Sequence, residues 1–206
     1  MNAKKNSTIA ICLIVVLAFS PVATFAQASN TFSGRAVALR ASAVGLALAV
    51  SDTGPLPASG GNLKTSLAGI DVLGLVSADV LGAATSGSGT SSQSKASVAD
   101  LSLLGGLVAA DLVKSNSSAS CSNGQAAVTG SSEIVGLVVA GVPVLALNPN
   151  LAISLPGGFS VIVNEQTSSP PNGNTGTMTV NALHVSGPSI DIVVASANSG
   201  ITCAGV

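Results

Sequence analysis

The chain has almost no aromatic side chains. It contains no Trp and no Tyr, and aromatic residues make up only 2% of the sequence. Exposed aromatic faces commonly bind sugars, and stacked aromatic rings hold single-stranded nucleic acid. The composition therefore nearly excludes both kinds of aromatic site.

Charged residues, histidine and clustered cysteines are also scarce. Five basic and eight acidic residues follow residue 28, which gives that part of the chain a net charge of −3. The sequence shows no basic patch of the kind that neutralises phosphates, so we expect no nucleic-acid partner. The single histidine, His184, has no second histidine near it, and no Cys-x-x-Cys pair occurs. We therefore expect no metal site and no cofactor.

The N-terminal residues have the three parts of a secretory signal peptide. Two lysines precede an apolar run over residues 9–19, and small residues allow cleavage after Ala26 or Ala28. The run is shorter than the roughly 20 residues that span a bilayer, which disfavours the alternative of an uncleaved anchor. No second apolar span follows, so we expect no membrane span once the signal is removed.

These features predict a signal peptide over residues 1–28 and one exported domain over residues 29–206. We expect that domain to be secreted or to remain at the cell surface. Val, Leu, Ile and Ala supply nearly all of its apolar surface, so its core must be aliphatic. Disordered chains combine low hydrophobicity with high net charge, and this chain has neither property.

Two cysteines, Cys121 and Cys203, follow the predicted signal peptide, whereas Cys12 lies inside it. An even number of cysteines in an oxidising compartment predicts a disulfide. This bond would close a loop of about 82 residues and stabilise the fold by at most about 4.5 kcal/mol. The alternative is two separate free thiols.

Short apolar runs with many Gly and β-branched residues predict an all-β fold. Residues 159–166 and 177–185 are expected to form a hairpin that places Glu165 near Thr179 and Ser160 near His184. The Pro, Asn and Gly residues between these strands favour a loop. We also expect long polar loops over residues 54–61 and 86–94.

The sequence contains weak internal repeats. Residues 74–80 (Gly-Leu-Val-Ser-Ala-Asp-Val) resemble residues 106–112, and a fainter copy covers residues 136–142. These repeats predict an antiparallel β-sandwich built of similar hairpins. The alternative is an irregular β-solenoid, which the drifting spacing disfavours. Aspartates recur in the repeats, and we interpret them as solvated charges that limit aggregation.

Three short motifs, taken in order, resemble the bacterial exported domain called choice-of-anchor P. They are residues 102–108 (Ser-Leu-Leu-Gly-Gly-Leu-Val), 164–166 (Asn-Glu-Gln) and 180–185 (Val-Asn-Ala-Leu-His-Val). The resemblance covers nearly all of the predicted exported domain. It implies export and surface association, without an assigned activity. Residues 196–206 show no sorting motif, apolar tail or basic stop, so we expect release or non-covalent retention.

One polar group on otherwise apolar strands is the candidate ligand site. Its members are Asn164, Glu165, Gln166, Asn181 and His184. The alternative interpretation is a hydrogen-bonding cluster that fixes the end of the hairpin. A hydrolase centred on His184 is the weakest hypothesis, because no Gly-x-Ser-x-Gly turn leads into a helix. No catalytic residue is assigned.

The sequence thus favours a non-enzymatic structural or interaction protein of the cell envelope or extracellular matrix. Backbone edges of β-strands and a low net charge favour association with itself or with other envelope components. The alternative is a module that binds a small ligand or glycan through the Glu165–His184 region.

Overall fold

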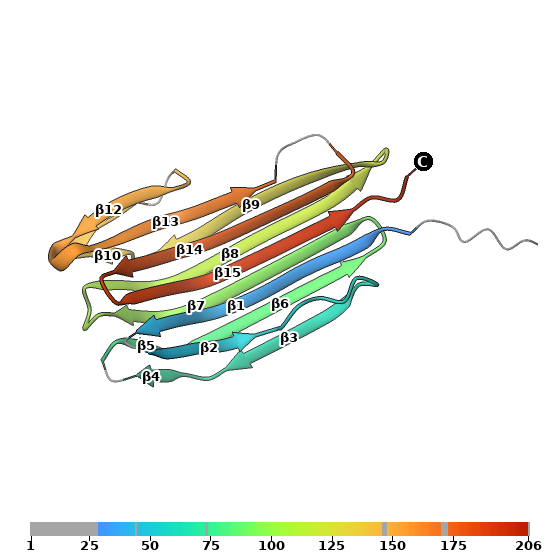
Figure 1. The fold of residues 1–206 in the computed structure, drawn as a ribbon. Coiled ribbons are helices and arrows are strands. Elements are labelled where there is room, and N and C mark those ends of the chain that lie inside the picture. Colours follow the sequence, from blue (N-terminus) through green and yellow to red (C-terminus); the bar gives the residue numbers. More distant parts are fainter. Residues whose placement is uncertain (1–28, 44, 73, 146–147, 170–172, 206) are drawn as a thin grey trace, which may run out of the picture.

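The part of the chain that the structure describes folds mainly into β-strands (Figure 1). The computed structural model describes residues 29–205 apart from 44, 73, 146–147 and 170–172. Those ranges contain no α-helix, and the one short 3-10 turn spans Pro156–Gly158. The all-β prediction is therefore confirmed. The predicted signal peptide, with Cys12 inside it, lies outside the described residues.

One antiparallel sheet, here called sheet A, has six strands in the order β12-β13-β14-β15-β1-β2. Its long strand β14 begins with alternating outward polar and inward apolar side chains, where Thr177 and Thr179 flank the buried Met178. This alternation is what a half-buried strand requires. The strands are β1 (Thr31–Ala43), β2 (Leu46–Asp52), β12 (Leu151–Leu155), β13 (Phe159–Ser168), β14 (Thr175–Gly187) and β15 (Ile190–Thr202).

The second sheet, sheet B, has nine strands, and its long ones pair antiparallel in the order β3-β6-β7-β8-β9. Short strands extend one end of it, with β5 paired to β7 and β10 paired to β8. The strands are β3 (Gly61–Leu67), β4 (Ile70–Val72), β5 (Val76–Ala78), β6 (Val80–Ser88), β7 (Ser91–Leu103), β8 (Val108–Ser122), β9 (Gln125–Val135), β10 (Val138–Val139) and β11 (Val142–Pro143).

The two sheets pack face to face with their long strands nearly aligned, as Figure 1 shows. The core between them is aliphatic, and its largest fully buried side chains include Leu39, Leu81, Leu103, Leu183 and Ile192. Neither sheet closes on itself. The predicted β-sandwich is therefore confirmed, in preference to the solenoid.

The repeats mark equivalent strand starts within one sheet. Gly74, Gly106 and Gly136 each have a positive φ. Each is followed by a leucine, and the residue after that leucine begins β5, β8 or β10, respectively. A left-handed backbone at these positions suits glycine. Strand β8 pairs with β7 and with β10, and β7 also pairs with β5. The repeated segments therefore gather at one end of sheet B.

A row of residues across sheet A shifts the in-and-out alternation of its strands by one residue. Ser51, Asn164 and Ala195 have positive φ values of 47°, 54° and 50° and lie on β2, β13 and β15. The paired residues on either side put Ala38 of β1 and Ala182 of β14 in the same row. We call these five residues the reversal row. In a regular strand, residues an odd number of positions apart point to opposite faces. When the reversal row lies between two such residues, both point to the same face.

This shift explains how polar residues gather on the outer face of sheet A. In β1, Arg35 and Arg40 are both exposed although five residues separate them, and Ala36 and Leu39 are both buried. In β14, Asn181 and His184 are both partly exposed, while Ala182 and Leu183 between them are buried.

The predicted register of the β13–β14 hairpin was wrong by two residues. Glu165 pairs with Asn181 rather than Thr179, and Ser160 pairs with Ser186 rather than His184. The reason is that the two strands do not end together. Strand β14 begins at Thr175, and its first three residues pair only with β15, whereas β13 ends at Ser168 opposite Met178.

The predicted polar loop over residues 86–94 was also wrong, because that segment is a tight hairpin. Strand β6 continues to Ser88 and β7 starts at Ser91. Ser92 and Ser94 of β7 face the interior and bond to sheet A: Ser92 Oγ donates to the carbonyl of Ser33 at 2.8 Å, and Ser94 Oγ donates to the carbonyl of Asn198. A Cβ on Gly34 would lie 2.5 Å from Thr85 Oγ1, so glycine permits this close approach of the sheets.

A disulfide joins the two sheets at one end of the sandwich. Cys121 lies on β8 of sheet B, and Cys203 follows β15 of sheet A. Their Cα atoms are 5.6 Å apart, and the bond spans 82 residues of sequence. Beside it, Phe32, Leu56 and Ile201 form a small second core. The predicted cysteine pairing is confirmed.

Candidate functional site

Three of the five predicted ligand residues meet on the outer face of sheet A. Glu165 Oε2 accepts a hydrogen bond from Asn181 Nδ2 at 2.6 Å and lies 3.0 Å from His184 Nδ1. They meet because the reversal row brings Asn181 and His184 to the same face and Glu165 pairs with Asn181. The reversal row therefore brings Glu165 and His184 into contact across the β13–β14 pair.

The other two predicted residues lie apart from this group. Asn164 is buried in the reversal row, and its Oδ1 accepts from Gln166 Nε2 at 2.8 Å. The backbone N–H of Gln166 donates to Asn150 Oδ1, and the N–H of Asn150 donates to the carbonyl of Asn164. These bonds hold the start of β12 against β13. Asn164 and Gln166 therefore fix the chain locally.

Two residues that the sequence analysis missed complete the outer network. His184 Nε2 lies 2.9 Å from Asp191 Oδ2, and Ser196 Oγ donates to Asn181 Oδ1 at 2.7 Å. Asp191 and Ser196 both lie on β15, which pairs with β14. The signal for them is the Gly187-Pro188 turn, which predicts a second hairpin and sets Asp191 opposite Ser186, close to His184.

The imidazole of His184 is held between two carboxylates. Burial lowers the pKa of His184, but the hydrogen bonds to Asp191 and Glu165 outweigh it, so the pKa lies above the ordinary histidine value. Both ring nitrogens donate when the ring is protonated, and each then has a carboxylate as its acceptor. Neither nitrogen faces a serine hydroxyl, so this arrangement supplies no serine–histidine pair.

The polar groups around Glu165 thus satisfy one another. Glu165 accepts from two donors, Asn181 both donates and accepts, and His184 bonds at both nitrogens. Nearby, Arg35 forms an ion pair with Asp52, and its hydrogen bond holds the pKa of that carboxyl below the usual range. A hollow of about 260 Å³ lies between the arginines and Asn181. The alternative interpretation, a hydrogen-bonding cluster, fits these contacts better than a ligand site.

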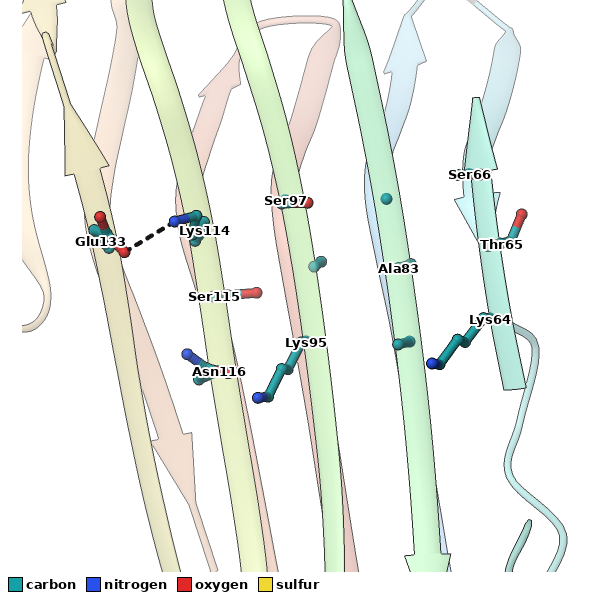
Figure 2. A pocket seen from close by; sticks show the side chains of 13 residues that line it. Lys64, Thr65, Ser66, Ala83, Lys95, Ser97, Lys114, Ser115, Asn116 and Glu133 are labelled. Carbon is teal, nitrogen blue, oxygen red and sulfur yellow. Dashed lines mark hydrogen bonds and ion pairs between the residues drawn. The ribbon is translucent and has the colours of Figure 1, made fainter. Parts of the chain in front are cut away.

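The outer face of sheet B carries a larger hollow, of about 700 Å³, which the sequence did not predict (Figure 2). All three lysines that follow residue 28 line it: Lys64 on β3, Lys95 on β7 and Lys114 on β8. The sequence places them 31 and 19 residues apart, so only the strand order brings them together. The strand order therefore gathers three lysines, together with Glu133, on this face.

Acidic residues occupy the other end of the same face. Asp100 stands opposite Asp111, because their flanking residues are paired, and the N–H of Asp79 donates to Ala99 beside them. All three side chains are exposed. Within the described ranges, no three His, Cys, Asp or Glu side chains gather closely enough to hold a metal ion. The same part of the chain has no helix with the length and hydropathy to cross a membrane.

Strand β9 forms a long open edge of sheet B. It pairs with β8 over its whole length. The N–H of Ala126 points away from β8 and donates to the carbonyl of Gly173. Because successive residues alternate, the backbone groups of Val128, Gly130, Ser132 and Ile134 point to that same open side. Among the described residues, no other strand pairs with them.

Comparison with known proteins gives this chain no relative. No family model, curated protein or solved structure matches it. The resemblance to the choice-of-anchor P domain stays a prediction, and the functional argument depends on the contacts described above.

Proposed function

We propose that the protein is a non-enzymatic, exported interaction protein of the cell envelope or extracellular matrix, and that it associates with a second copy of itself through β9. The observation that carries this proposal is the open edge of β9. An unpaired edge presents a row of backbone donors and acceptors that another strand can complete. Pairing two β9 strands antiparallel about a two-fold axis gives a closed dimer.

The other sheet edges carry features that oppose strand addition. Strand β12 is five residues long and is followed by Pro156, and β2 has a left-handed residue at Ser51. Strand β3 has an exposed lysine, Lys64. Short length, backbone irregularity and edge lysines are the usual protections against unwanted pairing.

Strand β9 has none of these protections. It is eleven residues long and contains no proline and no lysine, and none of its residues has a positive φ. Its single charge, Glu133, lies 3.3 Å from Lys114 of the neighbouring strand. Electrostatic repulsion between two β9 strands is therefore small.

Export is supported by two further features. The predicted signal peptide would direct the chain out of the cytoplasm, and the pairing of Cys121 with Cys203 is typical of an oxidising compartment. A β domain whose two sheets are joined by a disulfide also suits a role in the envelope or matrix.

The test is the mass of the chain from Ser29 onward, measured by light scattering over a concentration series. We expect a concentration-dependent increase to twice the mass of one chain. Thr129→Lys adds a charge to β9 without disturbing its bonds to β8, and it should raise the dimer dissociation constant about fivefold through like-charge repulsion.

Gln93→Lys is the matched control. Gln93, Ser118 and Thr129 form one row across sheet B, and Gln93 and Thr129 are both exposed, but only Thr129 lies on the edge strand. The control should dimerise like the parent chain. A mass that stays at one chain at every concentration, or an equal effect of both lysines, would contradict the proposal.

A further inference from the structure

The hollow on the outer face of sheet B lies outside both the Glu165–His184 network and the open side of β9. We propose that it binds an anionic polysaccharide through the carboxylate or sulfate groups of its sugars. This site does not depend on dimerisation, since its lysines come from β3, β7 and β8 of one chain.

The positions of the lysines follow from the strand register. Lys64 pairs with Ala84, and Ala84 pairs with Lys95, so the two lysines share one row across three strands. Strands are about 4.8 Å apart, which separates the two backbones by about 10 Å. Lys114 lies in the neighbouring row, opposite Ser97. The three ammonium groups therefore line a path that crosses the strands.

Two of these cations have no ionic partner among the described residues. Lys114 lies 3.3 Å from Glu133, but neither Lys64 nor Lys95 forms an ion pair there. In Figure 2 the side chains of Lys64 and Lys95 both lean across the sheet in the direction of β9. Two ammonium groups without an ionic partner in the described chain are thus available to a negatively charged group in the hollow.

Small residues form the floor of the hollow. Gly82 and Ala84 on β6 and Ser97 on β7 lie where larger side chains would fill the space. The volume of about 700 Å³ is within the range of ligand pockets. Ser66, Ser97 and Asn116 add hydroxyl and amide groups to the lining, and such groups hydrogen-bond to sugar hydroxyls.

The surroundings favour a polysaccharide over nucleic acid. No aromatic side chain lines the hollow, so bases would have nothing to stack on. The exposed aspartates at residues 79, 100 and 111 lie on the same face and would repel duplex DNA, which carries one negative charge per about 1.7 Å of its axis. A polysaccharide needs no aromatic partner, because its hydroxyl groups can bond to serine and asparagine side chains.

The experiment is a binding titration of the chain from Ser29 onward with four probes. Polygalacturonate carries carboxylates, dextran sulfate carries sulfates, single-stranded DNA carries phosphates, and unmodified dextran carries no charge. We expect binding to one or both charged polysaccharides at low ionic strength and none to dextran. Raising the salt should weaken the binding, since the lysines are exposed to solvent.

Substitution of Ala84 separates charge from bulk. Ala84→Glu puts a carboxylate between Lys64 and Lys95, which should occupy both ammonium groups and abolish binding. Ala84→Gln has nearly the same shape without the charge, and it should keep affinity within about threefold of the parent. Thermal unfolding of both variants checks that they fold.

Removing lysines gives a second, independent readout. Lys64→Gln combined with Lys95→Gln should weaken binding about tenfold, whereas Arg40→Gln on the outer face of sheet A should leave it unchanged. Equal binding of the Ala84→Glu and Ala84→Gln variants would overturn the proposal. So would binding to dextran alone, no binding to either charged polysaccharide, or binding only to single-stranded nucleic acid.

Discussion

The outer faces of the two sheets both carry polar side chains, but the Glu165 network of sheet A has partners for its groups, whereas two lysines of sheet B do not. On sheet A, Glu165, Asn181 and His184 bond to one another and to their neighbours. On sheet B, Lys64 and Lys95 face a hollow without an ionic partner in the described chain. A dense polar group therefore does not by itself mark a binding site. Unsatisfied charge beside open space is the better indication.

The difference also has an energetic side. Groups that satisfy each other stabilise the fold, and removing one leaves its partners without a bond. Exposed cations that await a ligand contribute little to folding. The comparison therefore predicts that substitutions on sheet A change stability, whereas substitutions on sheet B change binding.

The largest expected effect on stability comes from the disulfide that joins the two sheets. Replacing Cys121 and Cys203 together with Ala should lower the free energy of unfolding by about 2 to 4 kcal/mol, because the bond closes a long loop. Urea denaturation measures this loss. The double variant should still bind polygalacturonate below its melting temperature, since the hollow lies within sheet B. Loss of binding in the folded variant would show that the faces are not independent.

A smaller effect is expected from the sheet A network. Glu165→Ala removes the acceptor shared by Asn181 and His184, and it should lower the free energy of unfolding by about 1 to 2 kcal/mol. The comparison is Lys64→Gln, which should change stability by less than about 0.5 kcal/mol. Both values come from urea denaturation at one pH. A larger loss for the lysine variant would reverse the assignment of the two faces.

The smallest effect is the pH dependence contributed by His184. Its pKa in the folded chain is raised, so its stabilising contribution is full below the unfolded value of about 6.5 and is lost as pH rises through the folded value. The stability difference between the parent chain and His184→Gln should therefore be larger at pH 6 than at pH 8.5. Because the chain has one histidine, its imidazole resonance in an NMR titration reports the same pKa directly. An equal difference at both pH values would contradict this role.

Sequence reasoning succeeded where the signal was local. Alternating apolar residues and β-branched residues predicted the strands on either side of the 169–174 loop, and two cysteines predicted their own pairing. The prediction of a loop over residues 86–94 failed because the composition of this segment resembles that of a loop. Ser92 and Ser94 are buried because carbonyl groups of sheet A accept their hydrogen bonds, and these partners are 59 and 104 residues away in the sequence.

The candidate site was predictable only in part. Glu165 and His184 stood out because polar residues are rare on these strands, but the sequence did not place Asp191 beside them. The reversal row is not visible as a pattern, since alanine and serine at left-handed positions give no signal of their own. The three lysines required the complete strand order of sheet B, which no short-range pattern supplies.

The central claim is that sheet A stabilises the fold and sheet B binds. One measurement tests it most directly: the affinity of Glu165→Ala and of Ala84→Glu for polygalacturonate or dextran sulfate, whichever binds the parent chain, titrated under the same conditions. We predict that Glu165→Ala binds like the parent chain while folded and that Ala84→Glu does not bind. Lost binding in folded Glu165→Ala together with unchanged binding in Ala84→Glu would place the ligand site on sheet A and contradict the account.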